Sequence, residues 1–198
     1  ITVVRPDGKR EIFTRNGTHW TGDPDNPDTL VEADNAQGVA TGYTVFIAAL
    51  RHSESYDADG LLQAVTDQTG QGITLTYSTA ATPASTAPVP GLLLTVTDPT
   101  GRQLQFTYTS DCQVHQVTLP DGKILTYDYD IVGRLISVQY PDTRKRQYLY
   151  NEYALRSATN LLYALTGIID ESDVRYESIS YDGSGRATSS SEANNVDK

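Results

Sequence analysis

The sequence is poor in several residue types, and each shortage excludes a class of protein. Its 198 residues include no methionine, one cysteine and one tryptophan, with 15 Lys and Arg against 25 Asp and Glu. A single cysteine cannot form an internal disulfide, so a disulfide-stabilised scaffold is excluded. The formal net charge of −10 opposes binding to nucleic acids and anionic membranes, which require basic surfaces. We therefore expect neither as a partner.

Long apolar runs are also missing. The longest fully apolar run, Val45–Leu50, is far too short to span a bilayer, and no charged-then-apolar signal precedes it. Only 38% of the residues are hydrophobic, and 13 tyrosines stand against three phenylalanines. This composition suits a repeat sheet with tyrosines at the water boundary better than a thick globular core.

A repeat organises the residues that are present. Val-Thr-Asp-Pro-Thr-Gly at 96–101 returns as Val-Thr-Leu-Pro-Asp-Gly at 117–122 and as Val-Gln-Tyr-Pro-Asp-Thr at 138–143. A tyrosine follows each copy, at positions 108, 129 and 150, so the unit recurs every 21 residues. Further copies stand 31 residues upstream and downstream, and Val3–Phe13 fits the same frame. A fixed period of this kind indicates a structural repeat.

Each repeat has the pattern of a β-hairpin. From Leu92 to Tyr108 the large apolar residues other than Leu93 take even positions, which is the period of a strand. Asp98-Pro99-Thr100-Gly101 and its counterparts have turn composition, and the Tyr-Asp-x-x-Gly segments provide the second turn. Cys112 takes the glycine position of one turn, which makes that turn atypical. We expect an all-β antiparallel meander that coils or closes, because a flat sheet of so many strands is unfavourable.

Three insertions interrupt the period. We interpret residues 1–198 as one repeat array with insertions at about 16–29, 80–90 and 152–165. The first has loop composition and is expected to be fastened by Trp20. The second is rich in proline and should be exposed and partly extended, and the third could hold a short helix. The absence of methionine and an unfinished repeat after Gly185 lead us to expect a fragment of a larger protein.

The same residues resemble a known family. Tyr-Asp-x-x-Gly-Arg-Leu-x-x-Val at 129–138, its relatives at Tyr56 and Tyr181, and Val-Thr-Asp-Pro-x-Gly at 96–101 are similar to the repeats of bacterial Rhs, or YD-repeat, proteins. The resemblance covers most of Tyr56–Thr188 and fits the first 16 residues more loosely. Similar repeats build the C component of insecticidal toxin complexes and the YD shell of teneurins. The family's autoproteolytic core motif and variable toxin segment are not present here, so neither self-cleavage nor toxicity carries over to any residue.

The resemblance implies a fold and a role. In the family, the repeats spiral into a hollow β-cage around a C-terminal toxin segment that is often delivered by type VI secretion. The chain is therefore expected to be a curved, spiralling sheet of antiparallel hairpins, a non-catalytic piece of cage wall without a cofactor, in a secreted or cell-surface protein. The repeat-defining residues, expected to be structural, are Tyr56, Asp57, Gly60, Tyr77, Asp98, Pro99, Gly101, Tyr108, Pro120, Asp121, Gly122, Tyr129, Asp130, Gly133, Arg134, Tyr150, Tyr181, Asp182, Gly185 and Arg186.

Partners follow from the same resemblance. They are the remaining shell and the C-terminal effector of the parent protein, together with secretion machinery. A fragment with unpaired strand edges is also expected to self-associate. The alternative function is a carbohydrate-binding repeat of a surface adhesin, because tyrosines in register could stack on sugar rings. We favour the structural reading, since a cross-strand tyrosine ladder explains the spacing without any ligand.

Three groups of residues suggest other chemistry. Oxygen ligands for Ca²⁺ cluster at Asp23, Asp25, Asn26 and Asp28, and less fully at Asp57, Asp59 and Gly60. Turn formation before proline and glycine explains the same residues, so no metal site is predicted. The three histidines, at positions 19, 52 and 115, lack ligand spacing, and no base is placed to activate Cys112.

Overall fold

The computed structural model describes residues 1–157 and 160–192, and its elements are almost all β-strands. One helical element, the single 3₁₀ turn η1 (Tyr153–Leu155), occurs among the described residues. The strands are β1 (Thr2–Val4), β2 (Arg10–Ile12), β3 (Thr14–Asn16), β4 (His19–Thr21), β5 (Thr29–Asp34), β6 (Ala40–Ile47), β7 (His52–Asp57), β8 (Leu62–Asp67), β9 (Gly72–Tyr77), β10 (Leu93–Thr97), β11 (Gln103–Tyr108), β12 (Val114–Thr118), β13 (Ile124–Tyr129), β14 (Leu135–Gln139), β15 (Lys145–Tyr150), β16 (Leu165–Ile169), β17 (Arg175–Tyr181) and β18 (Ala187–Glu192).

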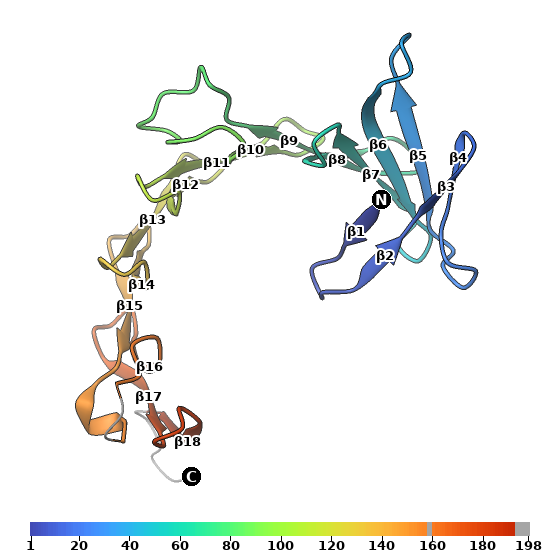
Figure 1. Ribbon diagram of the computed structural model, residues 1–198. Coiled ribbons are helices and arrows are strands. Elements are labelled where there is room, and N and C mark those ends of the chain that lie inside the picture. The colour runs from blue at the N-terminus through green and yellow to red at the C-terminus, as the bar shows by residue number, and fades with distance from the viewer. Residues whose placement is uncertain (158–159, 193–198) are drawn as a thin grey trace. The chain divides into compact units, whose positions relative to one another are not determined.

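The chain divides into two compact units. Unit 1 comprises Ile1–Thr82 and Val89–Leu104, and unit 2 comprises Pro83–Pro88 and the chain from Gln105 onward. Strands β5 to β18 follow one another in chain order in one open sheet, while β1–β2 and β3–β4 are separate two-stranded hairpins (Figure 1). The predicted all-β class and antiparallel hairpin repeats are confirmed. No helix in the described part of the chain has the length and apolar character needed to cross a membrane.

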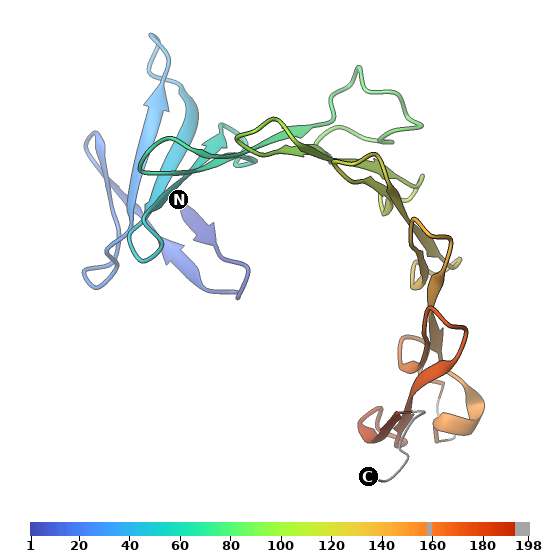
Figure 2. The ribbon, with the colours of Figure 1, turned by 180° about the vertical axis from the view of Figure 1, so that it is seen from behind.

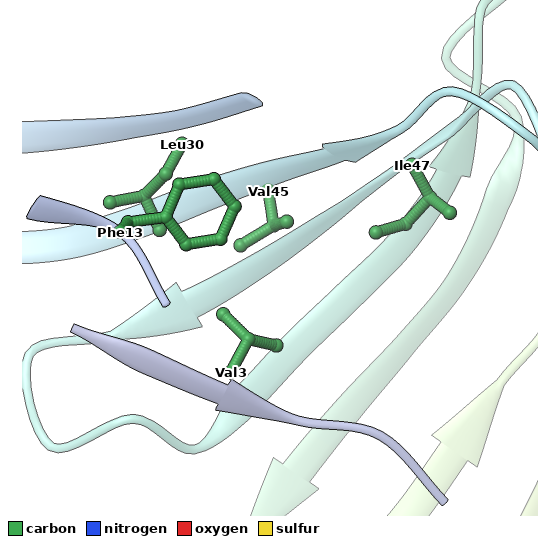
Figure 3. Packing of buried hydrophobic residues seen from close by; sticks show 5 residues of the cluster. All are labelled: Val3, Phe13, Leu30, Val45 and Ile47. Carbon is green, nitrogen blue, oxygen red and sulfur yellow. The ribbon is translucent and has the colours of Figure 1, made fainter. Parts of the chain in front are cut away.

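Unit 1 has a small two-layer core. Hairpin β1–β2 lies over the face of β5–β7 that carries Val45, and Val3 and Phe13 join Leu30, Val45 and Ile47 in one buried cluster (Figure 3). Phe13 and Val45 are each only 1% exposed. Complete burial of such side chains contributes about 1.5–3 kcal/mol each. Unit 1 is therefore held together in part by an ordinary hydrophobic core.

Unit 2 is a sheet whose two faces differ. Cross-strand partners share a face, so the register joins Val117 to Leu125 on one face and Gln116 to Thr126 on the other. The next pairs continue this division, with Tyr127 beside Val138. Over β12–β14 these pairs put apolar and aromatic side chains on one face and amides and hydroxyls on the other, and Arg146 joins the apolar face beside Val138. Among the described residues of unit 2, the only side chain less than 2% exposed is that of Thr166.

The three predicted insertions have more structure than their composition suggests. The first was expected to be loop, but it contains β4, which pairs with β3 and lies beside β5 (Figure 2). Asn16-Gly17, with φ of +62° at the glycine, allows this tight hairpin. Trp20 fastens the hairpin as expected, since its ring packs on the core and its Nε1 donates to Glu32 at 2.7 Å.

The later insertions are anchored as well. Ser78 closes the proline-rich loop, because its Oγ accepts from Leu92 N and donates to Val89 O, at 2.9 and 2.8 Å. Most of that loop is exposed as expected, but Ala87 is buried at 3% exposure. The third insertion holds η1, and residues 158–159 of it lie outside the described residues. The interpretation of the whole chain as a single array stays a prediction.

Candidate functional site: the tyrosine ladder and the repeat turns

The recurring tyrosines act as clamps between strands. Tyr129, Tyr150 and Tyr181 each end a strand, and their hydroxyls donate to the carbonyls of Val114, Leu135 and Leu165, all at 2.9 Å. Each acceptor is the first residue of the preceding strand. In unit 1, Tyr77 binds Leu62 O in the same way at 2.7 Å. These tyrosines stand on every second strand, so the cross-strand tyrosine pairs predicted from the spacing do not form: Tyr129 pairs with Leu135 and Tyr150 with Leu165. The ladder consists instead of hydroxyl-to-backbone hydrogen bonds.

Each clamp coincides with an irregularity of the sheet. The antiparallel register shifts between Asp128 and Tyr129, between Leu149 and Tyr150, and between Ser180 and Tyr181. A β-bulge locally disrupts the ladder of backbone hydrogen bonds and increases strand twist. The shift lies in the pairing with the following strand, whereas the tyrosine hydroxyl binds the preceding strand, on the other side. Burial raises the pKa of the Tyr129 and Tyr150 phenols, so both remain protonated donors at neutral pH.

An aspartate follows Tyr56, Tyr129 and Tyr181 and closes the next turn, and Asp98 closes a proline turn in the same way. Asp130 Oδ1 accepts hydrogen bonds from Val132 N and Arg134 N, both at 3.0 Å. Asp57, Asp98 and Asp182 accept from the same two positions of their own turns. Such bonds from an Asp side chain stabilise a turn that tertiary contacts do not hold. At Tyr129-Asp130, the tyrosine therefore binds the preceding strand and the aspartate binds the turn that follows.

An arginine at the end of the turn adds a second layer of contacts. Arg134 Nε and Nη2 both lie 2.6 Å from Asp130 Oδ2, and its guanidinium lies 4.8 Å from the centre of the Tyr150 ring. Its Nη1 donates to Leu162 O in the third insertion. Burial alone would raise the pKa of Asp130, but the bonds from Arg134 and the backbone lower it. Arg102 and Arg186 make the same pairing with Asp98 and Asp182 in more exposed settings.

The second kind of turn uses proline. In Pro120-Asp121-Gly122, Leu119 N donates to Lys123 O at 2.8 Å, and Asp121 Oδ1 accepts from Lys123 N at 3.1 Å. Gly122 has a φ of +81°, which is the left-handed conformation that this turn requires. Thr143 occupies the equivalent position of the next proline turn with a φ of +71°, whereas Cys112 takes the glycine position of the other kind of turn with a φ of +63°. Cys112 is exposed. Its turn keeps the regular backbone hydrogen bond from Cys112 N to Thr109 O, but the positive φ strains the backbone at this residue.

The structure places the predicted site residues in two sets. The tyrosines stand at strand ends, or one residue before the end for Tyr56, and Tyr56 binds Glu54 instead of a backbone carbonyl. Asp57 is the last residue of β7, and the other turn residues lie in the connections between strands: Gly60, Asp98, Pro99, Gly101, Pro120, Asp121, Gly122, Asp130, Gly133, Arg134, Asp182, Gly185 and Arg186. Tyr108 ends β11, where its backbone N donates to Thr86 O at 2.9 Å.

The weaker candidates are engaged in structural contacts. Asp28 Oδ1 accepts from Ala48 N at 2.8 Å and its Oδ2 lies 3.7 Å from Arg5. Within residues 1–157 and 160–192, no group of three or more His, Cys, Asp or Glu side chains could hold a metal ion. His115 Nδ1 lies 3.3 Å from Tyr127 O, while His19 is exposed on β4.

Two ionic networks escape prediction from sequence. In unit 1, Arg5 contacts Glu11 and Glu54, which lie 6 and 49 residues away. In unit 2, Arg175 makes a two-pronged pair with Glu152 at 3.0 and 2.7 Å, and Thr166 Oγ1 donates to the same carboxylate. The sequence feature that relates to the second network is Gly167, because a Cβ at this position would lie 2.3 Å from the Arg175 guanidinium.

A surface hollow of about 640 Å³ lies at one edge of unit 2. Tyr140, Pro141 and Glu171 line it together with three paired charges, Lys123, Asp142 and Arg144. Lys123 and Arg144 each lie 2.6 Å from an aspartate of their own turn. The hollow therefore presents side chains that already have partners.

Fold and site together define a class of protein: an antiparallel β-hairpin repeat whose unit is a Tyr-Asp corner. The Teneurin YD-shell family model matches residues 46–159, more than half of the chain. The chain belongs to this family of YD-repeat shells, as the resemblance in the sequence indicated. The match leaves out Ile1–Val45, which includes most of the strands that form the core of unit 1.

Solved structures give the same fold. The crystal structure of TcdB2-TccC3 without its hypervariable C-terminal region is similar, with a TM-score of 0.50 and 18% identity over 96% of this chain and 11% of that chain. A second crystal structure of TcdB2-TccC3 and the Photorhabdus luminescens Tc holotoxin pore are also similar at 18% identity. Both have TM-scores of 0.49 and cover 96% and 93% of this chain, and 11% and 10% of theirs. The chain thus spans about a tenth of the structures that it matches. No match was found among curated protein sequences.

Proposed function

We propose that this chain is a non-catalytic wall segment of a larger YD-repeat shell that encloses a C-terminal effector and takes part in its delivery. Membership of the YD-shell family supports this role. The observation that carries it is the tyrosine ladder, because the hydroxyls that could recognise a ligand instead bind the backbone of the preceding strand. In this repeat, the tyrosine hydroxyls form hydrogen bonds that hold neighbouring strands together.

The mechanism would be confinement. A continuous wall of paired strands separates an enclosed polypeptide from the cytosol of the producing cell until the protein is exported. Secretion machinery and the rest of the shell are the proposed partners, and a secreted or cell-surface location follows from that role. The toxin complexes to which the fold is similar support a toxin-type parent protein.

The carbohydrate-binding alternative receives less support from the geometry. A sugar platform needs tyrosine faces that are open to solvent, and the ladder tyrosines are half-buried. Self-association through strand edges remains part of the proposal, because β18 is an edge strand of the sheet and all its residues are exposed.

Limited proteolysis of the full-length parent protein, followed by mass spectrometry, tests the proposal. A C-terminal segment that stays intact and non-covalently retained, while exposed loops such as 80–90 are cut, is the expected result. A matched digest after unfolding in denaturant shows that the segment is otherwise cleavable. Digestion of that segment at the same rate as the loops would contradict enclosure, and glycan-binding screens would then be the next measurement.

A further inference from the structure

An ionic cluster fastens the N-terminal hairpin to the sheet of unit 1. Arg5, which follows β1, binds Glu11 Oε2 of its own hairpin through Nε and Nη2 at 3.0 and 2.8 Å. Its Nη1 binds Glu54 of β7, and Asp28 lies 3.7 Å away. The Arg5 side chain is 14% exposed and that of Glu11 only 4%. One guanidinium thus joins the hairpin to two segments of the underlying sheet.

The carboxylate of Glu54 is the centre of this attachment. Besides Arg5, it accepts from Tyr56 Oη at 2.8 Å, and its Oε1 lies 3.4 Å from His52 Nε2. That histidine nitrogen is buried and makes no hydrogen bond. On the neighbouring strands, Glu54 faces the uncharged side chains of Val45 and Val65. The hairpin contributes two further charges, Glu11 and Lys9, whose Nζ lies 3.0 Å from Glu11.

The rest of the hairpin has little other hold on the sheet. Val3 is its buried contact with the core, while Val4 and Ile12 are 62% and 54% exposed. The hairpin strands are three residues long and pair with each other but not with the larger sheet. Short strands of this kind are marginally stable alone. The attachment therefore depends on Val3, Phe13 and the Arg5 contacts.

We propose that hairpin β1–β2 is an acid-releasable strap, which leaves the face of β5–β7 when Glu54 and Glu11 are protonated and Arg5 loses its anionic partners. This conformational device goes beyond the proposed wall function and does not depend on it. Release would uncover Val45 and Leu30, the apolar residues beneath the hairpin. The turns and tyrosine clamps of β7–β9 would remain in place.

The pKa shifts of Glu54 and Glu11 show in which direction pH changes the attachment of the hairpin. Burial alone would raise the pKa of Glu54, but hydrogen bonds from Tyr56 and Arg5 outweigh burial and lower it. The pKa of Glu11 is lowered in the same way by Arg5 and Lys9. A carboxyl whose folded pKa is depressed stabilises the fold above its unfolded value of about 4.3, and that contribution is lost as the pH falls below it. Release is therefore expected on acidification, below about pH 4.3.

Hydrogen exchange measured by mass spectrometry tests the strap. Peptides from residues 1–13 should lose protection by about tenfold or more between pH 7 and about pH 3.5, after correction for intrinsic exchange, while peptides from β6–β7 keep theirs. Glu54→Gln removes the charge and keeps the shape, so it should release the hairpin at neutral pH and flatten the pH response. Asp34→Asn is the matched control, because it also neutralises a carboxylate of the sheet, but an exposed one on β5, and it should leave the hairpin attached at neutral pH.

Two results would overturn the strap. Loss of protection in β6–β7 in step with the hairpin would show that unit 1 opens as a whole. A Glu54→Gln protein with the wild-type pH response would show that the carboxylate does not govern the attachment. If that variant fails to fold, the wild-type protein alone tests the strap, through the pH dependence of hydrogen-exchange protection in the hairpin compared with that in β6–β7.

Discussion

The two units solve the same problem of stability in different ways. Unit 1 buries Phe13 and Val45 almost completely beneath a second layer, whereas the buried apolar side chains of unit 2 are Ala87, Val117 and Val138, at 3–9% exposure. Unit 2 instead repeats polar contacts at its corners: a tyrosine hydroxyl binds a carbonyl at Tyr129, Tyr150 and Tyr181, and an aspartate binds two backbone amides after Tyr129 and Tyr181. In a repeat array each repeat contacts only its neighbours, so many small local contributions to stability replace one large hydrophobic core.

The largest expected effect tests the core of unit 1. Phe13→Ala should destabilise unit 1 by about 3–5 kcal/mol, because the ring is 1% exposed and its removal leaves a cavity among Val3, Leu30 and Val45. Chemical denaturation followed through the fluorescence of Trp20, the only tryptophan, measures this loss.

Val31→Ala is the matched control for the core. Val31 is on β5 and is 63% exposed, so its truncation should change the unfolding free energy by less than about 0.5 kcal/mol. If both substitutions lowered the unfolding free energy equally, the hydrophobic core would not be the feature that stabilises unit 1 differently from unit 2.

The next effect tests the clamps of unit 2. Tyr129→Phe keeps the ring and removes the hydroxyl that binds Val114 O, so the loss should be about 1 kcal/mol. Hydrogen exchange should accelerate in β12 and β13 and remain unchanged in β16–β17, because a repeat transmits its contacts to neighbours only. Tyr163→Phe, at a tyrosine that is 68% exposed, is the control and should have no measurable effect. Acceleration throughout unit 2 would contradict the picture of independent corners.

The difference between the units also explains what the sequence could reveal. Hairpins and turns are local features with a fixed period, so the 21-residue spacing of Tyr108, Tyr129 and Tyr150 was enough to predict them. The predicted pairing of these tyrosines with one another was wrong, because one hairpin per period puts them on every second strand. Strand β4 was missed because four turn-forming residues in the segment that follows it, Asp23 to Asn26, dominate the composition. The Arg5 cluster could not be predicted at all. Its partner Glu54 lies 49 residues away and no period relates the two.

A smaller effect of opposite sign tests backbone strain in the turns of unit 2. Thr143 has a φ of +71° at a position where Gly122 and Gly133 serve in other copies. A β-branched residue is strained in this conformation, so Thr143→Gly should stabilise the protein by about 0.5–1 kcal/mol after the entropy of glycine is counted. Thermal or chemical unfolding measures the gain. Gly122→Thr is the reciprocal change and should destabilise, and a gain from both would exclude strain as the cause.

The smallest effect concerns the charge of a single exposed turn. The hydroxyl of Thr100 donates to Asp98 Oδ1 at 2.7 Å, and with Arg102 and two backbone amides it lowers the pKa of Asp98 to about 2. Because the folded pKa is depressed, the carboxylate stabilises the turn above its unfolded value of about 3.9, and this contribution is lost as the pH falls from there through about 2. Titration of the Asp98 carboxyl carbon by NMR should show that midpoint, and Thr100→Ala should raise it. An unchanged midpoint in Thr100→Ala would show that the hydroxyl does not hold the charge, and the contacts that stabilise this turn, which lies in unit 1, would then need to be sought in its backbone amides alone.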